Sequence, residues 1–252
     1  MNSETYIKGK PVSLTVLDYG LFKVHANGRV IGIVGFLIRT DRDETILVDT
    51  GFPAKYAYDI EASSAEDKLG SFGVVLSLTE ENLPKAQLAK AGVAMDDVDL
   101  LVMTHTHIDH VGGIADFPGR PILMSAAERA LEKPIYWSGL KPLDWPDREY
   151  MLVDGDVDLG PGLKVLAAPG HTIGQLALLV ELPETGPVLL TGDAISRPAE
   201  IDERFDTADD PAAAIESADR LMRLAAEKGA MIIYGHSPEQ WPQLKKSPEF
   251  YA

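Results

Sequence analysis

The chain has 252 residues, 45 % of them hydrophobic, no cysteine and a formal net charge of −16 at pH 7. The hydrophobic fraction is sufficient for a substantial core, and the lack of cysteine excludes disulfides and thiolate metal sites. With 39 acidic residues against 23 basic ones, the composition argues against an enzyme that grips nucleic acid, because Lys and Arg contacts to phosphate dominate such binding.

The N-terminus, Met-Asn-Ser-Glu-Thr, lacks the basic and then apolar pattern of a signal peptide. No apolar run reaches the length needed to span a bilayer. We therefore expect a cytoplasmic protein that binds neither membranes nor nucleic acid, either as a monomer or as a homodimer. We expect residues 1–252 to form a single domain.

Runs rich in Val, Ile and Leu predict the first strands, at residues 12–18, 29–38, 45–49 and 100–103. Residues 53–80 are less regular, and we expect a loop there. Such a long loop would either close over a functional site as a lid or lie on the surface.

Two short helices are expected in the middle of the chain. Residues 86–91 form the first, and Gly92 ends it as a glycine C-cap. Ser125 and Glu128 have the spacing of a capping box, which predicts a second helix that runs through Leu131.

The clearest helix begins at Asp210-Pro211, an N-cap followed by proline at the first helical position. Apolar residues from Ala214 to Ala225 then recur with helical spacing on one face, and Gly229 ends the helix. Strands that alternate with helices indicate the α/β fold class.

The run from His105 to His110, His-Thr-His-Ile-Asp-His, is the most informative motif. It places three of the six histidines and one carboxylate in six positions, directly after a predicted buried strand. Imidazole and carboxylate groups bind zinc-like cations. We interpret the run as a metal-binding loop rather than a solvated turn.

Three further strands end in a glycine that is followed by a potential metal ligand. The strand at 163–168 precedes His171, the strand at 187–191 precedes Asp193, and the strand at 231–234 precedes His236. Each ligand would lie at the carboxyl edge of a sheet. Only His25 is left over, and we expect it to be an ordinary surface histidine.

These motifs resemble those of metallo-β-lactamase-superfamily hydrolases, whose His-x-His-x-Asp-His signature matches residues 105–110. The resemblance extends from about residue 12 to the C-terminus and implies a four-layer αββα sandwich. Asp49, in Val-Asp-Thr-Gly, resembles the family's early aspartate, which orients the metal loop. Within the superfamily, the length and ligand spacing resemble those of N-acyl-homoserine-lactone lactonases and related lactone hydrolases, some of which act in quorum quenching.

The resemblance implies a dinuclear site for two divalent metal ions, with open positions as in catalytic centres. Zinc is the expected metal, and manganese, iron and cobalt are alternatives. The ligands implied for the first ion are His105, His107 and His171, those for the second are Asp109, His110 and His236, and Asp193 would bridge the two.

The implied reaction is the opening of a lactone, a cyclic ester, by a metal-bridging hydroxide. Asp109 would deliver a proton to the leaving alkoxide as the catalytic acid. The same site could open a thioester, a phosphotriester or a β-lactam. A further alternative is a non-catalytic metal-binding sensor or scaffold.

Specificity is expected to depend on less regular features of the chain. Lactonases of this kind often carry a tyrosine three residues after the bridging aspartate, where this chain has Ser196. Tyr136 or Tyr234 could replace it, although packing roles are expected for both. Residues 134–150 are rich in aromatic residues and proline, and they either select the substrate or form a rigid connecting loop. We expect Ile108 to touch substrate and Trp241 to be a packing residue.

Overall fold

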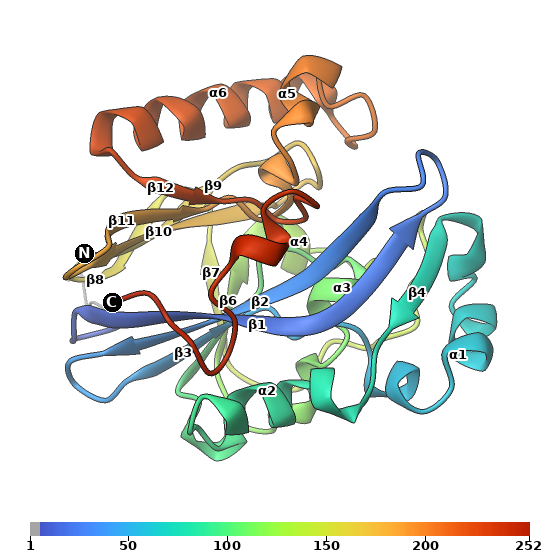
Figure 1. Ribbon diagram of the computed structural model, residues 1–252, viewed down its shortest axis with the longest axis horizontal. Helices are drawn as coiled ribbons and strands as arrows, with labels where there is room; N and C mark the ends of the chain where they lie inside the picture. The colour runs from blue at the N-terminus through green and yellow to red at the C-terminus, as the bar shows by residue number, and fades with distance from the viewer. Residues whose placement is uncertain (1–5) are drawn as a thin grey trace.

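The computed structural model describes residues 6–252, and its strands form two sheets that pack face to face (Figure 1). The first sheet has the strand order β4-β1-β2-β3-β5-β6-β7, and the second has the order β12-β11-β10-β9-β8. The bounds in the first sheet are β1 Pro11–Val24, β2 Val30–Thr40, β3 Thr45–Val48, β4 Gly73–Ser77, β5 Leu100–Val102, β6 Ile122–Ser125 and β7 Tyr150–Val153. Those in the second are β8 Val157–Gly160, β9 Leu163–Ala167, β10 Leu176–Leu182, β11 Gly186–Leu190 and β12 Met231–Ile233.

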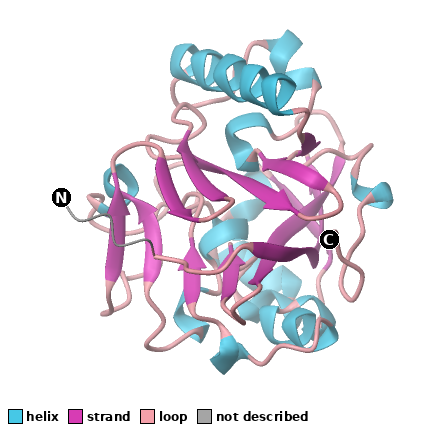
Figure 2. Ribbon diagram, turned by 90° about the vertical axis from the view of Figure 1, so that its left-hand side faces the viewer, coloured by secondary structure: helices cyan, strands magenta, loops and turns pink. Residues whose placement is uncertain are grey.

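Helices cover the outer faces of this pair of sheets (Figure 2). Their bounds are α1 Ile60–Glu66, α2 Pro84–Lys90, α3 Ile108–Val111, α4 Ala126–Arg129, α5 Ala199–Glu203 and α6 Pro211–Lys228. Helix α6 lies over the second sheet, whereas α1 and α2 lie on the opposite side of the molecule, beyond the first sheet (Figure 1). The arrangement is the αββα sandwich that the family resemblance implies (Figure 1), and it confirms the α/β class that the sequence predicted.

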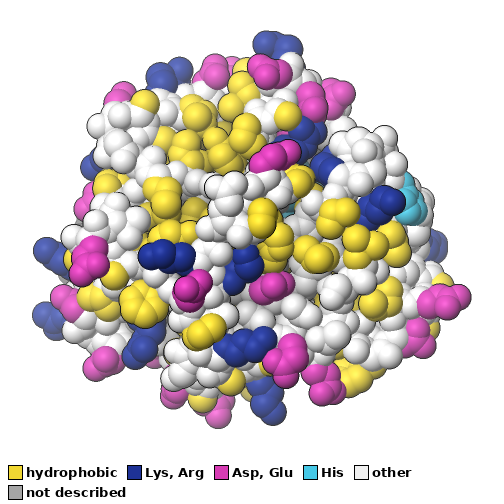
Figure 3. Space-filling view, viewed as in Figure 1, with side chains coloured by type: hydrophobic (Ala, Val, Ile, Leu, Met, Phe, Trp, Pro, Cys, Tyr) yellow, Lys and Arg dark blue, Asp and Glu magenta, His cyan; other side chains and the backbone are white. Residues whose placement is uncertain are grey.

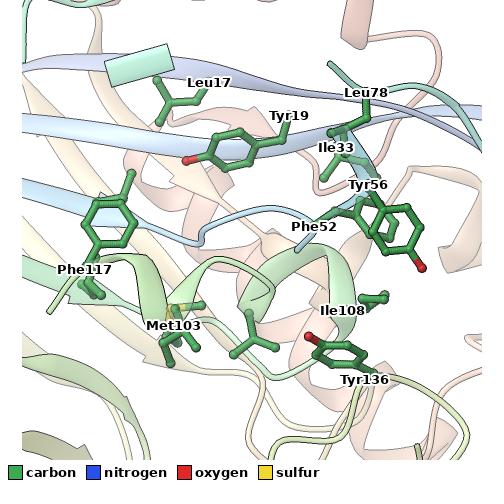
Figure 4. Close-up of a cluster of buried hydrophobic side chains, with 14 of the residues drawn as sticks. Leu17, Tyr19, Ile33, Phe52, Tyr56, Leu78, Met103, Ile108, Phe117 and Tyr136 are labelled. Carbon is green, nitrogen blue, oxygen red and sulfur yellow. The ribbon is translucent and has the colours of Figure 1, made fainter. Parts of the chain in front are cut away.

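Successive side chains along the strands point to opposite faces of the sheets, and they form three separate apolar layers together with the helices. In β1, Val16 packs between the two sheets, while its neighbour Leu17 packs on the outer side of the first sheet. Figure 4 shows part of this outer layer, including Tyr19 and Phe117. Leu179 of β10 and Leu221 of α6 belong to the third layer, outside the second sheet. Burial on both sides explains why the strands appear as continuous apolar runs in the sequence.

Most predicted elements are confirmed, with shifted ends. Strand β1 continues well beyond its predicted end at residue 18, because Gly20 adopts φ +108° at an irregularity in the pairing with β2. Helix α6 begins as predicted, since the Asp210 carboxylate accepts a hydrogen bond from the Ala213 amide, and Gly229 ends it with φ +61°.

Residues 53–80 are not the irregular loop that we expected. They contain α1 and the edge strand β4, which pairs antiparallel with β1. Tyr56 is fully buried against the first sheet. Glycines around Phe72 obscure the strand in the sequence, and only the pairing with β1 makes it regular. Much of the segment is therefore part of the fold rather than a free lid.

The Ser125–Glu128 pair forms only half of the predicted capping box. The Ser125 hydroxyl accepts a hydrogen bond from the Glu128 amide at 3.0 Å and so caps α4. The Glu128 carboxylate does not return to Ser125, because it accepts hydrogen bonds from Thr106 and Gly174 instead. Helix α4 ends at Arg129, two residues earlier than predicted.

No helix within residues 6–252 is both long and apolar enough to cross a membrane. On the face drawn in Figure 3, Lys and Arg side chains are scattered among Asp and Glu, with hydrophobic side chains between them. The basic residues on this face therefore do not gather into one patch.

Candidate metal centre

The seven predicted ligands lie just after strands of both sheets. Strand β5 leads directly into the loop that carries His105 and His107, and α3 carries Asp109 and His110. The remaining three ligands follow β9, β11 and β12 of the second sheet, and they are His171, Asp193 and His236. The two sheets thus bring together residues that are up to 131 positions apart in the sequence, which is the separation of 236 and 105.

The ligands form two adjacent groups in which the ligand atoms lie within 4.8 Å of one another. The first group consists of His105, His107, His171 and Asp193, and the second consists of Asp109, His110 and His236. The Asp193 carboxylate faces both groups. Its Oδ2 lies 3.3 Å from His171 Nε2, while its Oδ1 lies 3.2 Å from His236 Nε2 and 3.6 Å from His110 Nε2.

Two buried atoms of these groups have no hydrogen-bond partner among residues 6–252, and they are His105 Nε2 and Asp193 Oδ1. A buried polar atom without a partner is costly, so such atoms indicate a missing ligand. Imidazole nitrogens also face each other, with His171 Nε2 3.0 Å from His107 Nδ1. The nitrogen and oxygen donors therefore fit divalent cations.

Asp49 supports the metal loop from behind. Its carboxylate accepts hydrogen bonds from the Thr104 amide at 2.8 Å and the Thr104 hydroxyl at 2.7 Å. The same carboxylate lies 2.8 Å from His110 Nδ1, which leaves His110 Nε2 directed toward Asp193. Asp49 therefore fixes the orientation of one ligand without belonging to either ligand group.

The electrostatics of the first group favour neutral imidazoles. Burial, together with the nearby His171, lowers the pKa of His107 to about 4. Burial also lowers the pKa values of His105 and His171. Neutral histidines offer the free nitrogen lone pairs that a metal ion requires.

In the second group, nearby carboxylates have the largest net effect on the histidine pKa values. Burial by itself would lower the pKa of His110, but Asp109, Asp193 and Asp49 outweigh it and raise the pKa to about 10. Burial is likewise outweighed at His236, mainly by Asp193, and the pKa rises to about 9.

The same charges act on Asp193 in the opposite direction. Burial would raise its pKa, but His236, His110 and His171 hold it well below the usual value for a carboxyl group. Asp193 is therefore an anion between the two groups, as a bridging ligand requires.

The centre is open to solvent on one side. The side chains of His171 and Asp109 keep 24 % and 17 % of their surface exposed, whereas His105 and His110 are buried. Solvent therefore reaches the centre at His171 and Asp109.

The first part of the 134–150 region is fastened to the metal loop. The Ile108 amide donates to the Tyr136 carbonyl at 3.0 Å, and the Ile135 amide donates to the Thr106 hydroxyl at 3.2 Å. Trp137 stacks on Phe72 with ring centroids 6.4 Å apart. A cavity of about 560 Å³ lies beside this stack, lined by Lys68, Ser71, Trp137, Ser138, Gly139 and Leu140.

The rest of that region is a connecting loop with packed side chains. Trp145 donates its indole N–H to the Leu131 carbonyl at 2.8 Å. The Arg129 guanidinium lies 5.0 Å from the centre of the Trp145 ring and 4.5 Å from that of Tyr150. The expectation of a rigid connecting loop therefore holds for this part of the segment, and substrate selection by the first part stays a prediction.

We expected Ile108 to touch substrate, but its side chain lies in the core. Its side chain is only 3 % exposed and packs in the apolar layer outside the first sheet, together with Tyr56 and Tyr136 (Figure 4). The metal loop turns into α3 at this residue, so its neighbours Asp109 and His110 face the other ligands while Ile108 faces the core.

No replacement for the missing tyrosine is found at the two positions that we considered. Tyr136 is buried in the layer outside the first sheet, and Tyr234 packs in the layer beneath α6. Ser196 is itself buried, and its carbonyl accepts the His236 amide at 2.7 Å. Two other predictions are confirmed, because His25 is exposed and Trp241 packs over Gly32.

Comparisons with known proteins agree with this geometry. Residues 29–236 match the family model of the Metallo-beta-lactamase superfamily. The N-acyl homoserine lactonase AiiA of Bacillus thuringiensis subsp. kurstaki is 30 % identical over 225 residues, which cover 85 % of each sequence. The N-acyl homoserine lactonase AttM of Azorhizobium caulinodans is 31 % identical, with 74 % of this chain and 78 % of the relative covered.

The fold is also similar to that of a solved N-acyl homoserine lactone hydrolase with the product N-hexanoyl-L-homoserine bound at its catalytic metal centre. That similarity has a TM-score of 0.77 at 25 % identity, and it covers 97 % of this chain and 100 % of the other. The family match includes every candidate ligand from His105 to His236. The chain therefore belongs to the metallo-β-lactamase superfamily.

Proposed function

We propose that the protein is a dinuclear metal-dependent hydrolase that opens the ring of a lactone. The observation that carries this proposal is the convergence of seven ligands into two adjacent groups, with the Asp193 carboxylate facing both. The lactonase activity named for the relatives supports a cyclic ester as the bond that is broken.

In this proposal, His105, His107 and His171 hold one divalent cation, Asp109, His110 and His236 hold the other, and Asp193 contacts both. A bound pair of this kind polarises a carbonyl group and lowers the pKa of water to about 7. Zinc suits this set of nitrogen and oxygen donors, and manganese, iron and cobalt are the alternatives.

Asp109 is the candidate catalytic acid. Its Oδ2 lies 3.4 Å from His236 Nε2 within the second group, and part of its carboxylate remains open to solvent. A carboxylate placed between the ligands and the open side would first take the proton released by the attacking water and would then pass it to the leaving alkoxide. Because ligands come from both sheets, we propose that residues 1–252 act as one hydrolase domain.

We propose lactones in general as the substrate class, without naming one ring. Ser196 stands where lactonases often carry a tyrosine, so the preference of the relatives for acyl-homoserine rings is not carried over to this chain. We infer that the cavity beside Trp137 contacts substituents on the ring, because the preceding residues Ile135 and Tyr136 are hydrogen-bonded to the metal loop.

The first experiment is proton release from a panel of aliphatic, acyl-homoserine and aromatic-fused lactones. Zinc-loaded and manganese-loaded protein would be compared with the His107→Ala variant. We expect metal-dependent ring opening that the variant lacks. If protein with two bound metals leaves the whole panel intact, the lactonase proposal is wrong, and thioesters and phosphotriesters become the next substrates to test.

A further inference from the structure

Glu128 is a buried carboxylate that belongs to neither ligand group. Its residue is only 1 % exposed. Its Oε2 accepts a hydrogen bond from the Thr106 hydroxyl at 2.8 Å, and its Oε1 accepts one from the Gly174 amide at 3.2 Å. Neither donor carries a charge. A buried carboxylate with only neutral donors is costly, so its presence requires an explanation.

The two donors belong to the two loops that carry the histidines of the first group. Thr106 lies between His105 and His107, and Gly174 lies three residues after His171. Glu128 therefore joins these loops through one side chain. The His171 loop also packs closely against the start of α4, because a Cβ at Gly174 would overlap Ser125 Oγ and the Glu128 side chain.

Asp49 occupies an equivalent place on the other side of the metal loop. Thr104 and Thr106 flank His105, and each donates its hydroxyl to a buried carboxylate, to Asp49 at 2.7 Å and to Glu128 at 2.8 Å. Asp49 also contacts His110 of the second group. The first group has a carboxylate of the same kind in Glu128, linked to its histidines through the backbone of their loops.

We propose that Glu128 is a positioning residue for the first metal ion, and this inference rests on the proposed dinuclear function. Its two hydrogen bonds hold the His105–His107 loop and the His171 loop in fixed relation. Its negative charge, like those of Asp109, Asp193 and Asp49, also offsets part of the charge of the two divalent ions. Within residues 6–252 the Glu128 carboxylate accepts hydrogen bonds only from these two neutral groups, and a cation in the first group would supply positive charge.

The test is a metal titration of E128Q. Glutamine keeps the size of the side chain, removes its charge and turns one acceptor into a donor. Metal-free protein would be titrated with Co²⁺ and followed by its absorption spectrum, and Zn²⁺ affinities would be measured by competition with a chelator. We expect two ions in the wild type, and in E128Q a loss of about 10- to 100-fold in affinity for one of them.

A second background assigns the weakened site. In His107→Ala, the first group is already broken and one ion remains in the second group. Adding E128Q to this variant should leave the affinity of the remaining ion unchanged. A loss of affinity there would contradict a role restricted to the first group.

A milder variant tests the same link in case E128Q fails to fold. Thr106→Val removes the hydroxyl that Glu128 accepts, and it should also weaken one ion. Thr15→Val is the matched control, because Thr15 is a buried threonine of β1 that belongs neither to the metal loop nor to the two ligand groups. The control should bind both ions with wild-type affinity.

The outcomes separate the two proposals. If E128Q and Thr106→Val lower the unfolding temperature of the metal-free protein but bind both ions as tightly as the wild type, Glu128 is only a structural residue and the inference is wrong. If the wild type itself binds fewer than two ions, the dinuclear function fails first, and the role of Glu128 fails with it.

Discussion

The two halves of the candidate metal centre use the same side chains in different electrostatic settings. In the first group, burial and neighbouring imidazoles keep the histidine pKa values low, to about 4 at His107. In the second group, carboxylates raise them, to about 10 at His110 and about 9 at His236. The placement of carboxylates therefore divides the centre into two unequal halves.

The halves also differ in how they are held. His110 is oriented by a direct contact to Asp49, and His236 by a contact of its Nδ1 with the Gly32 carbonyl at 3.0 Å. His107 and His171 have no such direct contact with a supporting carboxylate. Glu128 instead links their loops, through hydrogen bonds from Thr106 and Gly174. A ligand that is oriented directly and a ligand that is oriented through its loop should respond differently to mutation.

The largest effect is expected from breaking the first half at a ligand. His107→Ala should remove one metal ion and reduce turnover by more than about 100-fold, because even the loss of an outer group costs 10- to 100-fold. The fold should survive, since the apolar layers do not include this side chain. Metal analysis, turnover and circular dichroism would check this.

His25→Ala is the matched control, because His25 is exposed. If His107→Ala kept its full metal content and normal turnover, His107 would not be a metal ligand.

Asp49→Asn should damage the second half most, because Asp49 contacts His110 directly but reaches His105 only through Thr104. Asparagine tolerates the positive φ of 60° at this position, so the backbone should be kept. The variant loses the charge that orients His110, and we expect a loss of about 10- to 100-fold in affinity for one ion. In combination with E128Q, both ions should be weakened. If Asp49→Asn and E128Q were to weaken the same ion, the division into two separately supported halves would be wrong.

Gly112→Ala tests how tightly the end of α3 is packed. A Cβ there would overlap the backbone of Phe52 and Pro53, so α3 and the second group must shift. We expect a loss of about 1–3 kcal/mol in the free energy of unfolding, measured with urea. Gly70→Ala is the control, because a Cβ at Gly70 meets no atom within 4 Å. Equal stability of the two variants would show that this contact relaxes easily.

The smallest effect is expected at Ser196, beside the shared Asp193. Ser196→Tyr would supply the phenol hydroxyl that this chain lacks, and one added hydrogen bond of about 1 kcal/mol would raise kcat/KM on homoserine lactones about fivefold. Ser196→Phe has the ring without the hydroxyl and should show no gain. Equal rates for the two variants would mean that the hydroxyl does not limit this reaction.

Local motifs in the sequence were sufficient to predict much of the fold and of the ligand set. A strand, a glycine and a ligand follow one another at His171, Asp193 and His236, and all three reach the centre. Helix α6 could be predicted at both ends, because its caps are encoded by Asp210 and Gly229. Strand β4 could not, because an edge strand interrupted by glycines is defined mainly by its pairing with β1.

The misreadings share one cause. Ile108 lies within the metal loop but faces the core, and Glu128 has the spacing of a capping box but bonds to two distant loops. The direction of a side chain at a loop–helix junction depends on which surfaces enclose it, and adjacent positions do not encode that.

The sequence by itself determined which residue types could bind metal and that each follows a strand, because ligand chemistry and strand patterns are local properties. The tertiary structure decided which ligands share a group and which carboxylates support them. Those relations depend on how two sheets pack, and they join residues as far apart as Gly32 and His236.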